Sequence, residues 1–170
     1  SPMSRGLGDV YKRQQHKPDL PFTPGTEMAG EVTALGENVT DFKIGDPVVG
    51  SALGGGLAEM GVFPAAGLRA IPKSMDFATA AATGSAYLTA YVSLVCRGHV
   101  QPGDWVLVHG AAGGVGLAAV DLAKHLGARV IAVASTAEKR HLIETHYAPD
   151  VVLDPEGGFR EAVKDCLLYT

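Results

Sequence analysis

The sequence predicts an α/β fold, in which a short β-rich region precedes the first half of a doubly wound parallel sheet. Two observations carry this prediction. Residues 15–73 are broken into short apolar runs by glycine and proline, which is typical of a small, strongly bent sheet. In residues 101–164, β-branched apolar runs alternate with helical patterns, and a glycine-rich turn follows the first run. That alternation is typical of parallel β–α–β units.

The composition excludes several classes of protein. Hydrophobic residues make up 46% of the chain and charged residues 19%, so a packed core is expected. The net charge of −4 argues against nucleic-acid binding, which requires clustered basic residues. Residues 105–120 are nearly uncharged but fall short of the ~20 residues that a membrane-spanning helix needs. Cys96 and Cys166 lack C-x-x-C spacing, so we expect no disulfide, no cysteine zinc site and a reducing, cytoplasmic environment.

The β-rich region is expected to contain short strands separated by loops with glycine or proline. They are residues 27–35, 46–50 and 57–64. Residues 74–100 are then expected to form helices that connect this region to the parallel sheet. Ser74 can cap the first of them, and the alanine-rich residues 78–82 favour a helix.

The second part is expected to hold parallel strands with a helix between each pair. The strands are residues 105–109, 129–134 and 151–153, and the helices are residues 114–126 and 136–145. Ser135 and Glu138 form a capping-box pattern at the second helix. This order is one mononucleotide-binding half of a doubly wound fold. Because the other half needs about as many residues again, we expect the chain to be incomplete and to show little or no turnover by itself.

The turn at residues 110–116 carries the chemistry. Against the pattern G-x-G-x-x-G, Ala111 takes the first glycine position, Gly113 the second and Gly116 the third. The second glycine lets the backbone approach a pyrophosphate, and the third lets the helix lie close to the strand. A tight structural turn is the simpler interpretation. Dinucleotide binding is favoured because the turn lies between a buried strand and a helix whose N-terminus attracts phosphate.

The end of the second parallel strand predicts which dinucleotide is bound. An NAD site places Asp or Glu there to bind the ribose diol, whereas this chain has Ala134 and Ser135. Ser135, Lys139 and Arg140 lie where a 2′-phosphate would sit. One hydrogen bond to a charged group contributes ~1.5–3 kcal/mol, which gives about a ten- to hundredfold preference. We therefore predict NADPH over NADH. Lys139 and Arg140 could instead be solvated helix charges, and for Arg140 the two interpretations have equal weight.

These segments identify a family. The chain resembles the quinone oxidoreductase (zeta-crystallin-like) branch of the medium-chain dehydrogenase/reductase superfamily. The matching motifs are LPFTPGTEMAGEV at residues 20–32, GDPVVG at 45–50, GGLAEMGVFPA at 55–65 and VLVHGAAGGVGLAAVDLAKHLGARVIAVAS at 106–135. Residues 1–14 and 165–170 depart from the family pattern. We expect both ends to be foreign to the native protein and residues 1–14 to be unstructured.

The resemblance implies a partial chaperonin-10-like catalytic domain at residues 15–73, followed after the connecting helices by the first half of a Rossmann domain at residues 101–164. It implies hydride transfer from NADPH to quinones, enones or other activated double bonds, and a homodimer. Zinc-dependent members carry a histidine ligand after the glycine at position 25, where this chain has Thr26, and the cysteine-rich zinc loop is absent. We therefore expect no metal.

The resemblance also implies the cofactor contacts. The pyrophosphate loop matches Ala112, Gly113, Gly114, Val115 and Gly116, the 2′-phosphate contacts match Ser135 and Lys139, and a threonine near the nicotinamide matches Thr89. Thr89 could equally be an ordinary helix hydroxyl. Pro155 stands where the family often has a tyrosine that contacts adenosine, which puts that contact in doubt. No catalytic residue is assigned.

Two other functions remain open at this point. The first is an enoyl-thioester reductase, which shares the fold and the cofactor with the quinone reductases. The second is a non-catalytic nucleotide-binding protein, which would keep the glycine turn without oxidising NADPH. No Ser/His/Asp or Cys/His set occurs at convincing spacing, and this agrees with chemistry supplied by a cofactor.

Overall fold

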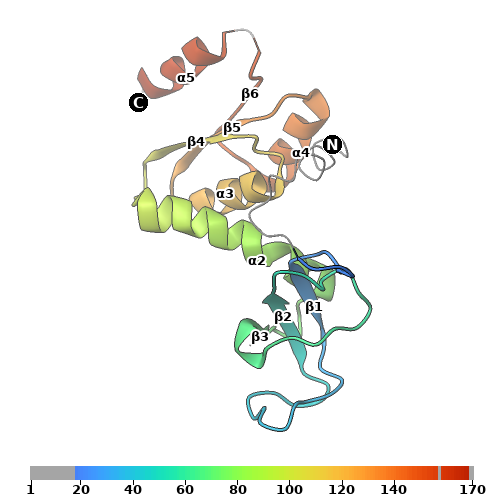
Figure 1. Ribbon diagram of the computed structural model, residues 1–170. Coiled ribbons are helices and arrows are strands. Elements are labelled where there is room, and N and C mark those ends of the chain that lie inside the picture. Colours follow the sequence, from blue (N-terminus) through green and yellow to red (C-terminus); the bar gives the residue numbers. More distant parts are fainter. Residues whose placement is uncertain (1–17, 157, 169–170) are drawn as a thin grey trace.

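The computed structural model describes residues 18–156 and 158–168. It contains an antiparallel and a parallel sheet, which lie at opposite ends of the described chain and are linked by the long helix α2 (Figure 1). The expected boundary at residues 1–14 lies outside the described part. Residues 165–168, which were expected to form a tail, belong to the last helix, α5 (Phe159–Leu168).

The first sheet is small, as predicted, and its strands are antiparallel, but they differ from the expected ones. It has the order β1–β2–β3, with β1 at Glu27–Glu31, β2 at Pro47–Ser51 and β3 at Leu68–Ala70. The strand expected at residues 27–35 ends early because its partner begins only at Pro47, which pairs with Glu31.

The strand expected at residues 57–64 is wrong. These residues form bends and irregular backbone, and the side chain of Val62 is fully exposed. The segment pairs with no strand of the sheet. Its first residue, Leu57, instead donates its N–H to the carbonyl of Pro24, which lies outside the sheet. The third strand forms after the 3-10 turn Ala65–Gly67 instead.

Helix α2 (Phe77–Tyr91) joins the two sheets. Asp76, and not Ser74, caps it, since the Asp76 carboxylate accepts a hydrogen bond of 2.9 Å from the N–H of Thr79. The helix packs against β1 at one end and against helix α3 at the other (Figure 1). It continues as a π-helical segment, Val92–Arg97. The expected connecting helices are therefore one helix with a π-helical end.

Two side-chain hydrogen bonds attach α2 to its neighbours. The N–H of Ser85 donates to Oε1 of Glu27 on β1 at 2.9 Å, and the hydroxyl of Tyr87 donates to Oδ2 of Asp121 on α3 at 2.6 Å. The hydrogen bond to Asp121 raises the pKa of Tyr87 to about 12, and burial and the charge of Asp121 act in the same direction. The tyrosine therefore stays a hydrogen-bond donor at neutral pH.

The second sheet confirms the prediction of a parallel half-sheet. Its order is β4–β5–β6, with parallel strands β4 (Trp105–His109), β5 (Arg129–Val133) and β6 (Val151–Leu153). Helix α3 (Gly114–His125) follows β4, and helix α4 (Ala137–Tyr147) follows β5. This strand order, third next to second next to first, is that of one half of a doubly wound fold.

The main core lies between this sheet and its helices. Its largest fully buried side chains are Val120 on α3, Val130 on β5 and Ile143 on α4. Ile131 on β5 is also fully buried but lies outside this cluster. The strands read as continuous apolar runs, which are typical of parallel sheets, although only β5 is buried over most of its length here. Among the described residues, no helix combines the length and apolar character that crossing a membrane requires.

The cap of α4 differs from the predicted one by a single residue. Thr136, not Ser135, precedes the helix, and its hydroxyl accepts a hydrogen bond of 3.3 Å from the N–H of Lys139. The pattern was ambiguous because serine and threonine are both good capping residues. The hydroxyl of Ser135 is thus not used by the cap and lies exposed at the end of β5.

Helix α3 begins unusually close to the strand that precedes it. A Cβ atom at Gly116 would collide with the carbonyl oxygen of Gly110 and lie 2.8 Å from Cα of Ala111. At Gly114, two residues earlier, nothing lies within 4 Å of such an atom. The predicted role of the third glycine is therefore confirmed: only glycine lets the first turn of α3 approach the backbone of the turn.

Asp150, directly before β6, links α3 and β5 at the amino-terminal edge of the parallel sheet. Its Oδ2 accepts hydrogen bonds from Nζ of Lys124 on α3 at 2.9 Å and from the N–H of Val130 on β5 at 2.7 Å. Burial alone would raise the pKa of Asp150, but the hydrogen bonds from Lys124 and Val130 and the lysine charge outweigh it, so the pKa is lowered.

We expect Gly116→Ala to destabilise the chain by about 1–3 kcal/mol, the usual cost of overpacking, because the clash is with backbone. Gly114→Ala is the matched control and should leave stability unchanged or slightly raised, since alanine is the better helix former. Urea unfolding followed by circular dichroism measures both. Equal stability of the two variants would contradict the proposed close approach.

Asp150→Asn should lower stability at pH 7 and lose its effect in acid. A lowered pKa contributes stability that is fully present above the unfolded value of about 3.9 and is lost as pH falls through the folded value. Urea unfolding at pH 7 and below pH 4 measures the difference from the unsubstituted chain, with Glu144→Gln, an exposed position on α4, as the control. A difference that persists unchanged in acid would contradict this assignment.

Candidate nucleotide-binding site

A cavity lies at the carboxyl edge of the parallel sheet, where open α/β sheets bind ligands. Its volume is about 160 Å³. It is formed by the turn after β4 and the segment after β5, and its lining residues are Gly110, Ala112, Gly113, Ala134, Ser135 and Lys139. The predicted residues Ala112, Gly113, Ser135 and Lys139 are therefore brought together, although Ser135 and Lys139 are more than twenty positions after Gly113 in sequence.

Backbone hydrogen bonds fix the turn that forms one wall. The N–H of Ala111 donates to the carbonyl of Val133 on β5 at 3.0 Å. Within the turn, the N–H of Gly113 donates to the carbonyl of Gly110 at 3.0 Å. Ala111 is fully buried beneath the turn. The turn is thus anchored to the neighbouring strand and does not depend on a ligand for its shape.

One turn residue was not among the predicted cofactor contacts. The spacing of G-x-G-x-x-G gives its first position to Ala111, but the residue before it, Gly110, lines the cavity and adopts the left-handed conformation, with φ of 61°. Alanine is unfavourable in this conformation. The signal that could have identified Gly110 is its place directly after the last strand residue, where the chain must turn sharply.

Helix α3 points its N-terminus at this end of the sheet. Gly114, Val115 and Gly116 form its first turn, and the first intrahelical bond runs from the N–H of Leu117 to the carbonyl of Gly113 at 2.8 Å. The N–H groups of a first turn have no intrahelical acceptor. No acidic side chain occupies this turn and none caps it. The positive end of the helix dipole is therefore left for an anionic ligand.

The other wall carries the polar side chains. Ser135 and Lys139 are both exposed and line the cavity from the β5–α4 segment. The Thr136 cap fixes the first turn of α4 through the main chain of Lys139, so the lysine side chain starts from a defined backbone position. A hydroxyl and an ammonium group beside a small cavity are suited to a phosphate.

Arg140 does not line the cavity. Its Nη1 donates to the carbonyl of Ala134 at 2.9 Å and forms an ion pair of 2.8 Å with Oδ2 of Asp154, which follows β6. The arginine is three-quarters buried. The sequence left a phosphate contact and a solvated charge equally open for Arg140, and the structure supports neither, because the guanidinium is bound within the protein.

Thr89 is not brought to the cavity. It lies exposed on α2, and its carbonyl accepts a hydrogen bond of 2.8 Å from the hydroxyl of Ser93. Its place near a nicotinamide therefore stays a prediction. Within the described ranges 18–156 and 158–168, no three His, Cys, Asp or Glu side chains are grouped so that they could hold a metal ion.

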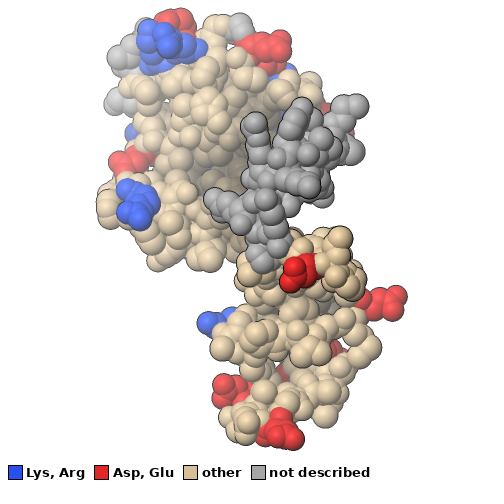
Figure 2. Space-filling view, viewed as in Figure 1, with Lys and Arg blue, Asp and Glu red and all other residues tan. Residues whose placement is uncertain are grey.

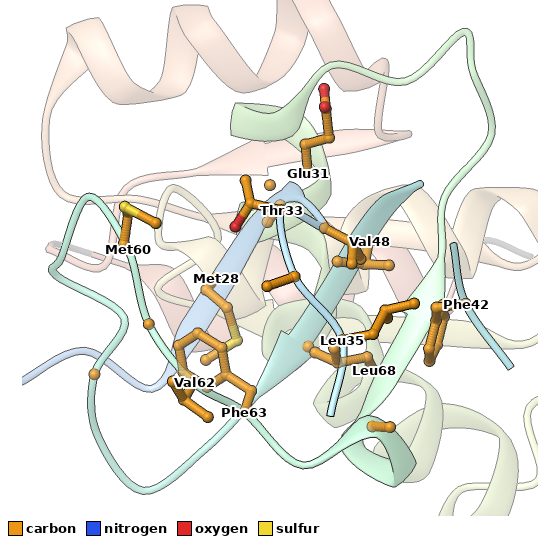
Figure 3. A pocket seen from close by; sticks show the side chains of 18 of the residues that line it. Met28, Glu31, Thr33, Leu35, Phe42, Val48, Met60, Val62, Phe63 and Leu68 are labelled. Carbon is orange, nitrogen blue, oxygen red and sulfur yellow. The ribbon is translucent and has the colours of Figure 1, made fainter. Parts of the chain in front are cut away.

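A larger cavity of about 630 Å³ belongs to the antiparallel sheet (Figure 3). Apolar side chains from β1, β2, β3 and the neighbouring loops form most of its lining, among them Met28, Val48, Phe63 and Leu68. None of the predicted cofactor residues lines it. On the face shown in Figure 2, charged side chains are scattered rather than gathered into one basic patch.

Comparison with known proteins agrees with this architecture. Residues 6–73 match the family described as the alcohol dehydrogenase GroES-like domain; the match begins ahead of residue 15, where the sequence suggested that the family pattern starts. The chain is 43% identical over 164 residues to a quinone oxidoreductase-like protein 2 homolog of Nematostella vectensis, covering 94% of this chain and 45% of that protein. It therefore spans about half the length of the curated relatives it matches.

Solved structures give the same result. The Escherichia coli quinone oxidoreductase complexed with NADPH matches with a TM-score of 0.83 and 33% identity, over 95% of this chain and 50% of that one. The CurK enoyl reductase matches with a TM-score of 0.82 and 32% identity, over 95% and 49%. With the sheet order, the glycine turn and these matches in agreement, the chain belongs to the quinone-oxidoreductase-like branch of the medium-chain dehydrogenase/reductase superfamily.

Proposed function

We propose that this chain contributes the adenosine and pyrophosphate half of an NADPH site in a zinc-independent oxidoreductase that transfers hydride to quinones or other activated double bonds. The observation that carries the proposal is the cavity between the glycine turn and the Ser135–Lys139 wall. The names of the similar proteins support the same chemistry: an NADPH complex of a quinone oxidoreductase is among the solved structures.

The residues fit the proposed cofactor. The amides of Gly114, Val115 and Gly116 at the start of α3 would hold the pyrophosphate, and Ser135 and Lys139 would hold the 2′-phosphate of adenosine. When bound, NADPH supplies the hydride. The task of this half of the protein is to bind and orient, because a cofactor of this kind carries the reactive chemistry itself. No residue of the chain is assigned a proton-transfer role.

Zinc-independence rests on the chemistry of the residue at the family's ligand position. Thr26 stands where zinc-dependent members have a histidine, and its carbonyl accepts a hydrogen bond of 2.9 Å from the N–H of Ala52. Catalytic zinc requires three protein ligands, of nitrogen, sulfur or carboxylate type, and a threonine supplies none of these. A small-molecule substrate, a cytoplasmic location and a homodimer complete the proposal, as the family resemblance implies.

An enoyl-thioester reductase is the second candidate. The similarity to the CurK enoyl reductase favours it, because that protein shares the same architecture at an identity close to that of the quinone oxidoreductase. The two functions differ in the acceptor, whose contacts would lie with the nicotinamide rather than with the adenosine cavity described above. The cavity therefore supports both reductases equally.

The cofactor prediction is tested with Lys139→Ala. We expect NADPH to bind about ten- to a hundredfold more weakly, because one charged hydrogen bond is lost, while NADH binding stays unchanged. Isothermal titration calorimetry with both nucleotides measures the ratio. Lys43→Ala, on an exposed loop of the antiparallel part, is the matched charge control. An unchanged NADPH-to-NADH ratio in Lys139→Ala would refute the assignment.

The substrate prediction is tested by turnover of the full-length protein. We expect NADPH oxidation to be faster, in kcat/KM, with a benzoquinone than with a crotonyl thioester. Absorbance of NADPH at saturating cofactor follows both reactions. Turnover of the thioester alone would establish the second candidate. Tight NADPH binding without oxidation by either acceptor would establish a non-catalytic nucleotide-binding protein.

A further inference from the structure

Asp154 does not line the nucleotide cavity, but it follows β6 next to the end of β5, and Ala134 and Ser135, which follow β5, do line it. The N–H of Ala134 bonds to the carbonyl of Leu153 at 3.1 Å, so Asp154 leaves β6 beside the point where Ala134 and Ser135 leave β5. Neighbouring strands lie about 4.8 Å apart, and charges interact in salt solution over about 8–10 Å. The Asp154 carboxylate is therefore within electrostatic range of a phosphate bound at Ser135 and Lys139.

An unpaired carboxylate here would work against NADPH. The 2′-phosphate carries about −1.5 to −2 charges at pH 7, as phosphate monoesters do, and would be repelled. NADH has a ribose diol at the same place, which carries no charge. A free Asp154 would thus shift the selectivity of the site towards NADH, against the preference that Lys139 creates.

Arg140 removes this conflict. It forms the 2.8 Å ion pair with Oδ2 of Asp154. The other carboxylate oxygen, Oδ1, accepts a hydrogen bond of 3.0 Å from the N–H of Glu156. The same guanidinium binds the carbonyl of Ala134 at 2.9 Å, which joins α4, the end of β5 and the end of β6. The partial burial of Arg140 and Asp154 lowers solvent screening and makes the neutralisation more effective than at an open surface.

We infer that Arg140 is a positioning residue for cofactor selectivity: it neutralises Asp154 and fixes the end of β5, so that the charge of Lys139 alone selects the 2′-phosphate. This inference rests on the proposed NADPH site. Arg140 acts through Asp154 and Ala134 and does not touch the nucleotide.

The test is a double-mutant cycle of Arg140→Gln, Asp154→Asn and the double variant, with calorimetric Kd values for NADPH and NADH. We expect Arg140→Gln to weaken NADPH about three- to tenfold, the size of one partly screened charge at this range, and to leave NADH unchanged or tighter. Asp154→Asn should tighten NADPH by a similar factor, because Arg140 keeps its charge. The double variant should return to the original ratio.

Salt and a conservative variant separate this role from a structural one. The selectivity change in Arg140→Gln should shrink at about 0.5 M salt, where the screening length is short, and Arg140→Lys should keep the original selectivity because it keeps the charge. Equal weakening of both nucleotides in Arg140→Gln, without recovery in the double variant, would show that Arg140 only maintains the fold and would overturn the inference.

The failure of this inference is distinguishable from failure of the proposed site. If Lys139→Ala leaves the NADPH-to-NADH ratio unchanged, the site itself is wrong, whatever the Arg140 variants do. If Lys139→Ala behaves as expected and the ratio is the same in Arg140→Gln as in the original chain, the site stands and the role of Arg140 is wrong. Circular dichroism of each variant establishes that it is folded before binding is measured.

Discussion

The site depends on one backbone contact, the hydrogen bond from the N–H of Ala111 to the carbonyl of Val133. It fastens the turn after β4 to the end of β5, and so fixes the wall from which the first amides of α3 project relative to the wall that carries Ser135 and Lys139. The close approach of α3 at Gly116 acts at the same place. Because both constraints are made by main-chain atoms, the two walls are positioned before any ligand arrives, which lowers the ordering cost of binding.

The parallel half-sheet could be predicted almost residue by residue, and the antiparallel part could not. The strands of the half-sheet appear as uninterrupted apolar runs, which are typical of parallel strands, so each run has one interpretation. The strand expected at residues 57–64 had a similar apolar content, but whether an apolar run forms a strand depends on a partner strand elsewhere in the chain. Its neighbours bond outside the sheet, and no local pattern reveals that.

The side chains of the candidate site could also be predicted only in part from the sequence. Ser135 and Lys139 were predicted because the end of a strand in this fold has a known relation to the ribose. The cavity brings them beside the glycine turn, and their contact with a phosphate stays a prediction. The partner of Arg140 could not be predicted, since Asp154 is fourteen positions away, after the next strand. The cap at Thr136 was missed by one position because the neighbouring Ser135 satisfied the same pattern. Gly110 was not predicted as a cavity residue because it lies just before the glycine motif.

Helix α2 joins the two sheets through one short polar contact on each side, Ser85 with Glu27 and Tyr87 with Asp121. These two attachment points are only two residues apart in sequence. If one sheet rotates relative to the other, either the whole helix must move with it or one of these two hydrogen bonds, near the middle of α2, must break. Thr89 lies two residues beyond the contact with Asp121, so its distance from any bound nucleotide depends on how α2 is attached to α3 and not only on its local conformation.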